Sequence, residues 1–304
     1  MTQDHITIGS YNCSGLSNPT KRHTVFSWLK DKNHQIYFLQ ETHSLPSDED
    51  KWRKEWDGPI IFCHGSRRSK GLMILFKKQL DFTIISTHTH AHIRSIISIV
   101  KMEQKQFCLV NLYGPNNDDP TVIESICDAI LDLQDHFDYI IMAGDFNTVL
   151  NSNIDRKGNQ TSNYHQHTLT EIQNTMDTLE LVDIWRIKNP QKIKYTWGRS
   201  LRASRIDYFL ISFSLIPKIN KVNIGDRFKS DHHLITLQLT VNEYPRGPGY
   251  WKFNQSLLAD DQYITKTKSF ITDFFNINIG SSDPLTVWDA FKCTLRGHTI
   301  AYSS

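Results

Sequence analysis

A short apolar run that ends at two polar side chains is the most constraining feature of this sequence. Residues 139–143 read Tyr-Ile-Ile-Met-Ala, and the run stops at Gly144. A run of this length, rich in β-forming residues, predicts a buried strand rather than a helix. Asp145 and Asn147 follow directly. Proteins that mix helices and strands bind ligands where buried strands end, so this point is a candidate functional site.

The two polar side chains also have an ordinary structural interpretation. An aspartate at this place can cap the next helix, and an asparagine can form a turn. The stretch alone leaves both interpretations open. However, Asn12, Glu41 and Tyr113 also stand at the ends of short apolar runs. Because strands paired in sheets bring such ends together, we expect these groups to surround one cleft.

A second acidic residue stands inside an apolar strand. Asp207 lies in the run 205–211, where a carboxylate is costly unless it is paired or hydrogen-bonded. A histidine is a suitable partner, and His232 or His233 is the candidate. His232 alone would be interpreted as a structural histidine. Asp207 and the adjacent Asp231 favour a functional Asp–His pair instead.

The composition is that of a soluble globular protein. The chain has 304 residues, of which 39% are hydrophobic and 22% charged. No apolar run approaches the roughly 20 residues that a transmembrane helix needs, so no membrane partner is expected. The N-terminus is polar, which predicts no secretory signal. Five scattered cysteines without a Cys-x-x-Cys spacing indicate reduced thiols. We expect a nuclear or cytoplasmic protein that is not secreted.

Basic residues are unevenly distributed, although the formal net charge is only +2. Residues 184–206 contain no acid and seven basic residues: Arg186, Lys188, Lys192, Lys194, Arg199, Arg202 and Arg205. Residues 64–80 contain no acid and five: Arg67, Arg68, Lys70, Lys77 and Lys78. One such run would be interpreted as a solvated loop. Two together favour a polyanionic partner, because clustered basic residues displace phosphate counterions.

The remaining pattern predicts alternating strands and helices up to residue 241. Further strands are expected at 5–11, 35–39, 72–76, 82–87, 93–101, 106–112, 195–198, 205–212, 219–224 and 234–241. Helices are expected at 21–30, 122–137 and 169–179. The breaker cluster at 245–249 is expected to end a compact domain of residues 1–243. Residues 244–304 would then be a linker and a partly helical C-terminal segment.

The candidate residues suit one type of chemistry. Glu41, Asp145 and Asp231 supply the hard oxygen ligands that Mg²⁺ prefers. The sequence contains no zinc-type His/Cys spacing, nucleophile elbow, phosphate-binding loop or dinucleotide fingerprint. Carboxylates, amides and an Asp–His pair fit a metal-assisted attack of water on a phosphoester.

Six short motifs, in this order, resemble the motif set of the endonuclease/exonuclease/phosphatase superfamily. They are Ser10-Tyr-Asn-Cys-Ser-Gly-Leu16, Leu39-Gln-Glu-Thr-His43, Asn111-Leu-Tyr-Gly-Pro-Asn116, Gly144-Asp-Phe-Asn147, Arg205-Ile-Asp-Tyr208 and Ser230-Asp-His232. The resemblance covers about residues 5–241. It implies an α/β fold, the four-layer α/β sandwich of this superfamily, in which two mixed β-sheets pack face to face with helices outside.

Within this superfamily the chain most resembles the apurinic-type endonuclease domain of a non-LTR (LINE-type) retrotransposon. The supporting segments are Gln40-Glu-Thr-His43, Asp155-Arg156 and Tyr195-Thr196. Residues 249–258 resemble the linker that leads to reverse transcriptase in such polyproteins. The resemblance therefore implies a covalently linked reverse transcriptase in a full-length element, and that polymerase is absent from this chain.

The resemblance assigns roles around a metal ion. Glu41 would hold Mg²⁺, for which Mn²⁺ would substitute, with Asn12 and Ser14 close by and Asp231 near the metal. Ser14 stands where apurinic endonucleases typically carry an aspartate, which argues against strong activity at abasic sites.

The resemblance also implies the catalytic groups. Asp145 would orient or deprotonate the attacking water, and Asn147 would position it. His232, oriented by Asp207, would stabilise charge on the phosphate.

Further side chains are expected to bind the substrate. Tyr113 and Asn116 would hydrogen-bond the scissile phosphate. Four residues are expected to contact DNA at the edge of the cleft: Arg156 and Thr196 by the resemblance, and Arg199 and Arg202 as part of a basic loop, residues 199–204. The strands on either side of this loop, 195–198 and 205–212, are expected to pair as a hairpin.

The implied function is a Mg²⁺-dependent endonuclease that nicks double-stranded DNA. Its products would be a 3′-hydroxyl and a 5′-phosphate, and the hydroxyl would prime reverse transcription. One alternative is an exonuclease III-like repair nuclease that acts at apurinic sites. Others are a phosphoinositide or sphingolipid phosphoesterase and an inactive DNA-binding remnant. The two basic runs argue against a lipid substrate, and the filled catalytic positions argue against a remnant.

Overall fold

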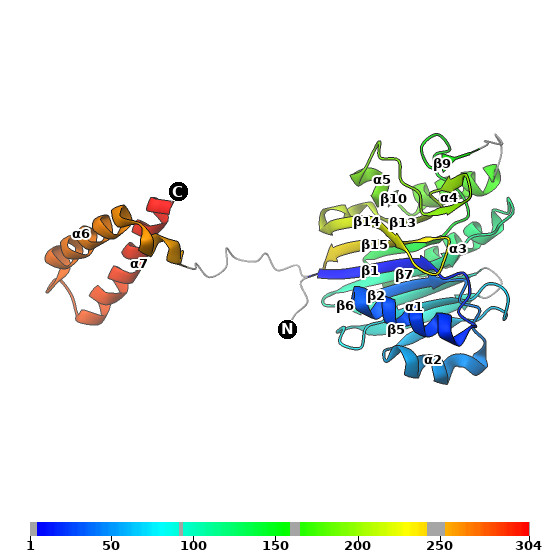
Figure 1. The fold of residues 1–304 in the computed structure, drawn as a ribbon, viewed down its shortest axis with the longest axis horizontal. Coiled ribbons are helices and arrows are strands. Elements are labelled where there is room, and N and C mark those ends of the chain that lie inside the picture. Colours follow the sequence, from blue (N-terminus) through cyan, green and yellow to red (C-terminus); the bar gives the residue numbers. More distant parts are fainter. Residues whose placement is uncertain (1–4, 91–93, 159–164, 242–252, 304) are drawn as a thin grey trace. The chain divides into compact units, whose positions relative to one another are not determined.

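The computed structural model describes residues 5–90, 94–158, 165–241 and 253–303 (Figure 1). The chain forms two compact units, Met1–Glu243 and Tyr244–Ser304. The first unit carries the strands. The second is helical.

Two six-stranded mixed sheets form the first unit. One has the strand order β14-β15-β1-β2-β4-β3, in which β1 and β2 run parallel. Its strands are β1 (His5–Asn12), β2 (Ile36–Gln40), β3 (Ile60–Cys63), β4 (Leu72–Phe76), β14 (Ile219–Arg227) and β15 (His233–Thr240). The other has the order β10-β13-β8-β7-β6-β5, in which β7 and β8 run parallel. Its strands are β5 (Thr83–His90), β6 (Ser95–Met102), β7 (Lys105–Tyr113), β8 (Tyr139–Asp145), β10 (Leu181–Asp183) and β13 (Asp207–Ser212).

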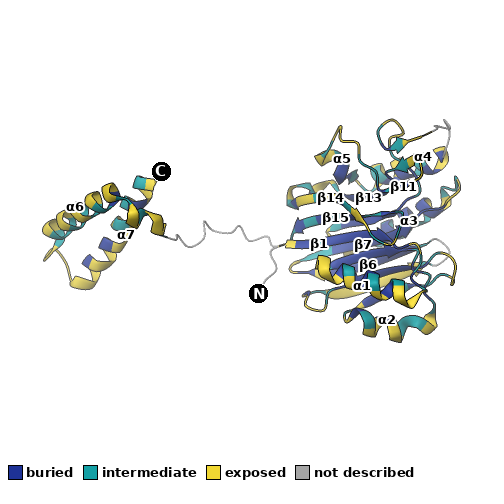
Figure 2. Cartoon of the chain, in the orientation of Figure 1, coloured by how far each residue is buried: buried dark blue, intermediate teal, exposed yellow. Residues whose placement is uncertain are grey.

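Three apolar cores separate four layers. The central core joins the two sheets, with Ile8 and Ile74 from one sheet against Leu109 and Ile141 from the other. A second core packs the second sheet against α3 (Thr121–Leu131) and α4 (Gln166–Thr178). A third packs the first sheet against α1 (Pro19–Lys32) and α2 (Glu49–Trp56). The central strands are buried on both faces, as the dark ribbons in Figure 2 show. The predicted four-layer α/β sandwich is confirmed.

Local sequence explains where α1 begins and ends. The Asn18 side chain accepts a hydrogen bond from the amide of Lys21, and Pro19 occupies the first turn. The helix ends at Asn33, which adopts a left-handed conformation (φ 58°). Short 3₁₀ helices lie at Pro46–Asp48, Gln134–His136, Phe213–Lys218 and Gln255–Ala259.

The region expected to be two strands joined by a basic loop has a different structure. Residues 199–204 are mostly part of a hairpin, in which β11 (Trp197–Arg199) pairs with β12 (Arg202–Ser204). β12 also pairs with β9 (Arg156–Lys157), which gives a separate three-stranded sheet. The expected pairing of 195–198 with 205–212 is therefore wrong, because β13 pairs with β8 and β10 instead. Sequence periodicity misses β3, β9, β10, α2 and α5 (Ile184–Lys188), which are short.

Two expectations fall on residues outside the described ranges. These are the start of the strand expected at Ile93 and the breaker cluster at 245–249.

A buried polar contact joins the two sheets beneath the ends of their central strands. Gln40, the last residue of β2, donates to Asn111 Oδ1 of β7 at 2.8 Å. Asn111 donates in turn to the carbonyls of Leu39 (3.1 Å) and Met73 (2.9 Å). Both amide side chains are fully buried. Because buried polar groups favour one hydrogen-bonded arrangement, this contact fixes how the two sheets meet.

A buried ion network uses two members of the basic run. Arg205 donates to Asp155 at 2.8 and 2.7 Å and to Asp183 at 2.6 Å, and Arg186 also bonds to Asp155. Arg205 and Asp155 are almost completely buried. Two of the seven basic residues in 184–206 therefore stabilise the fold and do not face a polyanionic partner.

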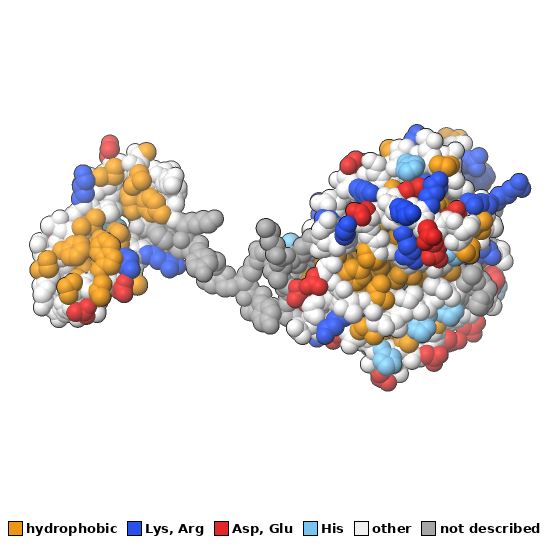
Figure 3. All heavy atoms as spheres, turned by 90° about the horizontal axis from the view of Figure 1, so that it is seen from below, with side chains coloured by type: hydrophobic (Ala, Val, Ile, Leu, Met, Phe, Trp, Pro, Cys, Tyr) orange, Lys and Arg blue, Asp and Glu red, His pale blue; other side chains and the backbone are white. Residues whose placement is uncertain are grey.

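The second unit contains α6 (Asp261–Asn278) and α7 (Pro284–Ser303). Tyr263 and Thr299 share a buried hydrogen bond of 2.8 Å between the two helices. Hydrophobic side chains remain on its surface, including Ile277, Leu285 and Trp288 (Figure 3). Among the described residues, no helix is long and apolar enough to cross a membrane.

Replacing Arg205 with methionine tests the ion network. Arg205→Met leaves Asp183 buried beside Asp155 without the shared guanidinium. We expect the free energy of unfolding, measured in urea, to fall by about 3–5 kcal/mol. The control is Lys78→Met, which removes the exposed Lys78–Asp57 pair and should cost less than about 1 kcal/mol. Equal losses in the two variants would contradict the structural role.

Candidate active site

A cleft of about 690 Å³ opens where the parallel strands of both sheets end. β1 and β2 end at Asn12 and Gln40, and β7 and β8 end at Tyr113 and Asp145. Nine of the residues predicted for the site line this cleft: Glu41, Tyr113, Asn116, Asp145, Asn147, Arg156, Arg202, Asp231 and His232. The expectation that strand ends collect polar groups around one cleft therefore agrees with the geometry.

Strand register places the polar groups around Asp145. In the ladders of β8, Asp145 lies opposite Tyr113 on one side and opposite Asp207 on the other. Gly144 allows β7 to approach, because a Cβ atom at this position would lie 1.9 Å from the carbonyl oxygen of Leu112. The glycine that ends the apolar run is thus required by the pairing that builds the site.

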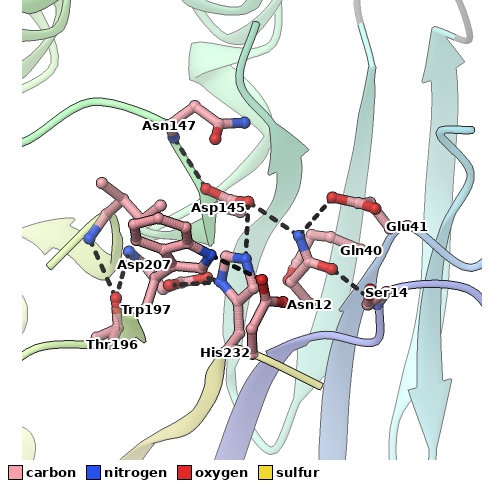
Figure 4. A network of polar contacts seen from close by, with 12 residues as sticks. Asn12, Ser14, Gln40, Glu41, Asp145, Asn147, Thr196, Trp197, Asp207 and His232 are labelled. Atoms are coloured by element: carbon pink, nitrogen blue, oxygen red, sulfur yellow. Dashed lines mark hydrogen bonds and ion pairs between the residues drawn. The ribbon is translucent and has the colours of Figure 1, made fainter. Parts of the chain in front are cut away.

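Asn12 joins two carboxylates that come from different sheets (Figure 4). Its Nδ2 donates to Glu41 Oε1 and to Asp145 Oδ2, both at 2.9 Å. Its Oδ1 accepts the amide of Ser14 at 2.9 Å. Since a backbone amide needs an acceptor, this bond sets the orientation of the Asn12 side chain. Asn12 therefore bridges Glu41 and Asp145 through its side-chain nitrogen. Its side-chain oxygen is bonded to Ser14 and is not directed at a metal ion.

A turn with unusual backbone geometry presents Glu41 to the cleft. Glu41 has a φ of 50°, which is uncommon for a residue with a Cβ atom. Its carbonyl accepts the amide of Gly15 at 2.8 Å, which ties this turn to the loop after β1. Glu41 is partly exposed, unlike the buried Asp145.

Asp207 pairs with His232, one of the two predicted histidines. His232 Nδ1 lies 3.0 Å from both carboxylate oxygens of Asp207, and its Nε2 lies 3.7 Å from Asp145 Oδ2. Figure 4 shows the ring between the two aspartates. His233 faces elsewhere, because its ring contacts the Gly225 carbonyl (2.8 Å) and Arg227 (2.9 Å).

Burial and neighbouring charges shift the proton affinities of this group. Burial raises the pKa of Asp145 well above its usual range, although His232 opposes the shift. Burial lowers the pKa of His232, but the Asp207 and Asp145 carboxylates outweigh it and raise this pKa to about 10. His232 is therefore a stable imidazolium, with Nδ1 donating to Asp207.

Asn147 and Tyr113 complete the wall beside Asp145. The backbone amide of Asn147 donates to Asp145 Oδ1 at 2.9 Å, and the side-chain Nδ2 of Asn147 donates to the Gly114 carbonyl at 2.9 Å. Burial, together with the carboxylates of Glu41 and Asp145, raises the pKa of Tyr113 far above its usual value. Its phenol stays protonated and can donate a hydrogen bond into the cleft.

The residues expected to contact DNA occupy different environments. Arg156 and Arg202 line the cleft on the three-stranded sheet, and Arg199 lies directly opposite Arg202 in the hairpin. Both hairpin arginines are exposed. Thr196, by contrast, is completely buried, and its hydroxyl accepts the amides of Ile206 (3.1 Å) and Asp207 (3.0 Å). The structure therefore contradicts a DNA contact for the Thr196 side chain, which instead supports the backbone of Asp207.

Two residues that sequence analysis did not single out also support the site. The indole of Trp197 donates to Asp231 Oδ2 at 3.0 Å. Ser230 donates to the Asn12 carbonyl (2.8 Å) and accepts the amide of His232 (3.1 Å). Ser230 lies within a recognised motif, and Trp197 directly follows Thr196. Position beside a motif was the available signal for both.

The cleft has the ligand chemistry for a divalent cation. Asp145, Asp207 and His232 place ligand atoms within 4.8 Å of one another. However, the Nδ1 proton of His232 is committed to Asp207, so this group is better described as a hydrogen-bonded Asp207–His232 pair with Asp145 at ion-pair distance. Glu41 and Asp231 are partly exposed carboxylates that line the same cleft. Oxygen donors of this kind fit Mg²⁺, which prefers carboxylates and water.

The four-layer α/β sandwich thus gathers acidic, amide and histidine side chains in one cleft, and these are the groups that a metal-assisted hydrolase uses. Residues 9–232 match the model of the Endonuclease/Exonuclease/phosphatase family, and the chain belongs to this family. The predicted superfamily is confirmed. The chain is also similar to the "Transposon TX1 uncharacterized 149 kDa protein" of Xenopus laevis, with 29% identity over 269 residues. This match covers 86% of the chain and spans about a fifth (20%) of that relative.

Solved structures with the same fold include nucleases. An AP endonuclease, LMAP, from Leishmania major has a TM-score of 0.68 at 17% identity and covers 79% of this chain and 89% of its own. A 3′ phosphatase, NExo, from Neisseria, bound to a product DNA hairpin, has a TM-score of 0.62 at 16% identity, and the match covers 77% of this chain and 99% of that one. An AP endonuclease from Archaeoglobus fulgidus has a TM-score of 0.59 at 19% identity, and the match covers 78% of this chain and 100% of that one. At these identities the likeness shows the fold alone.

Replacing Thr196 with valine distinguishes structural support from DNA contact. Thr196→Val keeps the shape but leaves the amides of Ile206 and Asp207 without this acceptor. We expect the free energy of unfolding to fall by about 1–3 kcal/mol. Thr196→Ser, which keeps the hydroxyl, should lose less, about 1 kcal/mol for the missing methyl group. Unchanged stability with weakened DNA binding in Thr196→Val would contradict the structural role.

Proposed function

We propose that this chain is a Mg²⁺-dependent endonuclease that hydrolyses a phosphodiester of double-stranded DNA and leaves a 3′-hydroxyl and a 5′-phosphate. The observation that carries the proposal is the convergence of Glu41, Asp145, Asp231 and the Asp207–His232 pair on one cleft with a basic wall. When water attacks a phosphodiester, the water loses a proton while negative charge builds up on the phosphate and the leaving oxygen. The cleft holds a group for each of these changes.

Glu41 and Asp231 would hold the metal ion. When bound, Mg²⁺ would polarise the phosphate and balance charge on the leaving oxygen. Asn12 keeps Glu41 in place through its 2.9 Å bond. The position of Glu41 as a metal ligand would therefore depend on Asn12, which also contacts Asp145.

Asp145 would take the proton from the attacking water. Asn147 donates to one of its oxygens and Asn12 to the other, so the plane of the carboxylate is fixed. Its raised pKa makes it a stronger proton acceptor than a solvated aspartate and brings it nearer the working pH. This suits general-base catalysis.

His232 and Tyr113 would stabilise the phosphate. Asp207 keeps His232 as an imidazolium with Nε2 directed to the side of Asp145. A charged donor inside a mostly buried site stabilises developing negative charge more than it would in water. Tyr113 would add a neutral donor from the opposite side of Asp145 in the β8 ladders, and Asn116 lies beside it in the cleft wall.

The three-stranded sheet supports DNA as the substrate. Arg156, Lys157 and Arg202 line the cleft, and Arg199 extends the same basic surface. Paired strands hold Arg199 and Arg202 side by side at the hairpin end, where they would contact phosphates or a minor groove. Basic residues spread along a wall fit the successive phosphates of a nucleic-acid backbone better than the single headgroup of one lipid.

The similarity to a transposon protein supports a more specific role. We propose that the nick supplies the 3′-hydroxyl from which a reverse transcriptase of the same element begins synthesis in the nucleus. Residues 1–243 would be the endonuclease domain, and 244–304 a linker and helical segment toward the polymerase. A repair-type activity at abasic sites is the alternative.

The proposal is tested by nicking of supercoiled plasmid with Mg²⁺, with EDTA, and with Mn²⁺. We expect nicking with either metal and none with EDTA. Asp145→Asn should lower the rate by about 10²–10⁴-fold, and Glu41→Gln should abolish nicking while both variants stay folded. The nicks should be extended directly by a DNA polymerase, which requires a 3′-hydroxyl. An oligonucleotide with one abasic site should be cut no faster than its intact counterpart. Parent-rate nicking by folded Glu41→Gln would refute the metal assignment.

Asp207 and His232 should behave as one catalytic unit. Because Asp207 acts by holding His232, Asp207→Ala and His232→Ala should each lose most nicking activity. The double variant should be little worse than the poorer single variant, as coupled catalytic residues behave. Single-turnover nicking rates measure this. Losses that multiply in the double variant would show that the two residues act independently.

A further inference from the structure

Trp197 stands at the junction between the basic hairpin and the metal-binding side of the cleft. It is the first residue of β11, it lines the cleft and it is partly exposed. Its indole Nε1 donates to Asp231 Oδ2 at 3.0 Å. Figure 4 shows the Trp197 side chain, and a dashed line marks the bond from its indole nitrogen. The indole N–H is the single polar group of this side chain, and the cleft gives it a carboxylate as its acceptor.

Backbone contacts connect the same two segments. Trp197 forms an isolated β-bridge with His232. The amide of Gly198 donates to the Asp231 carbonyl at 3.3 Å, and the amide of His233 donates to the Thr196 carbonyl at 2.7 Å. These backbone contacts hold residues 196–198 against residues 231–233, the two segments that the indole bond also connects.

The indole bond acts on the part of Asp231 that the backbone leaves undetermined. Backbone contacts fix the main chain of Asp231, but its carboxylate can still rotate about two side-chain bonds. A donor on Oδ2 selects one orientation of the carboxylate. Partners of this kind, which hold a metal ligand without touching the metal, typically change metal affinity or activity by 10–100-fold.

We propose that Trp197 is a positioning residue, which orients Asp231 for the metal ion through its indole N–H. The inference rests on the proposed function, because Asp231 is assigned there as a metal ligand. Two residues further along the same strand lies Arg199, opposite Arg202. β11, which is proposed to bind DNA through Arg199, would therefore also orient a metal ligand through Trp197.

The test is Trp197→Phe, which keeps an aromatic ring in the cleft and removes the N–H. Mg²⁺ binding is measured by calorimetry on the full chain without DNA. We expect Mg²⁺ affinity to fall by about tenfold or more. In nicking assays kcat should fall at moderate Mg²⁺ and recover in part at high Mg²⁺, while KM for DNA stays unchanged.

Trp56→Phe is the matched control. It makes the same substitution and also loses an indole hydrogen bond, to the Phe76 carbonyl at 2.8 Å, but in a buried core instead of the cleft. It should lower stability and leave Mg²⁺ affinity at the parent value. A loss of Mg²⁺ affinity in this control equal to that of Trp197→Phe would overturn the proposal.

A double variant tests whether Trp197 acts through Asp231. In an Asp231→Ala background, Trp197→Phe should cause no further loss of Mg²⁺ affinity. An equal further loss would overturn the proposal, as would parent affinity in Trp197→Phe alone. A raised KM with unchanged Mg²⁺ affinity would also overturn it, because the indole would then contact DNA directly. A parent protein that binds Mg²⁺ but does not nick DNA would refute the proposed function, while the Mg²⁺ titrations would still judge the role of Trp197.

Discussion

One amide side chain holds together the two halves of this site. Asn12 ends a strand of the first sheet, and its nitrogen donates both to Glu41, which directly follows β2 of that sheet, and to Asp145 of the second. Two carboxylates this close repel each other, the more so because Asp145 is buried. The shared donor offsets part of that repulsion and sets the position of both groups. The spacing between Glu41 and Asp145 therefore depends on how the two sheets meet.

The inter-sheet contact beneath Asn12 explains why that spacing is well defined. Gln40 and Asn111 form a buried hydrogen bond between the sheets, and each stands one or two residues before a site residue, Glu41 or Tyr113. An apolar core alone would allow the sheets to slide, since hydrophobic burial has no direction. The bonds donated by the side-chain nitrogens of Gln40 and Asn111 form in one register only. The two polar contacts together turn a generic sandwich into a specific cleft.

Much of the fold and the site could be predicted from sequence because the relevant signals are local. A buried strand that ends at Asp145, or an acidic residue inside an apolar run at Asp207, is visible in a few consecutive residues. The ordered motifs then predicted which strand ends meet. His232 rather than His233 as the partner of Asp207 could not be settled locally, because alternate residues of a strand point to opposite faces and the choice depends on register.

The errors arise where a residue's role depends on distant partners. Arg186 and Arg205 counted as part of a basic surface, yet Asp155, which lies thirty or more residues away in sequence, draws both into a buried network. Thr196 lies in a motif-like segment, but its hydroxyl is needed by the backbone amide of Asp207. Short strands such as β9 and β10 carry too few residues for a periodic signal. Long-range hydrogen bonds, which leave no periodic trace, decide each of these cases.

The distribution of charge suits two opposing demands of the proposed function, substrate binding and catalysis. In that function a polyanion would approach a cleft that already holds several carboxylates, so basic residues would be needed for binding. A basic residue placed beside Asp145 would lower its pKa and weaken it as a proton acceptor. His232 is the cation nearest to Asp145 among its named partners, and Asp207 neutralises much of its charge. The arginines stand instead on a separate small sheet, Arg199 and Arg202 at its exposed hairpin. There they would bind flanking phosphates, and solvent would screen the exposed arginines from Asp145. In the proposed function, a separate sheet that carries the positive charge would let one cleft attract DNA and keep a basic carboxylate.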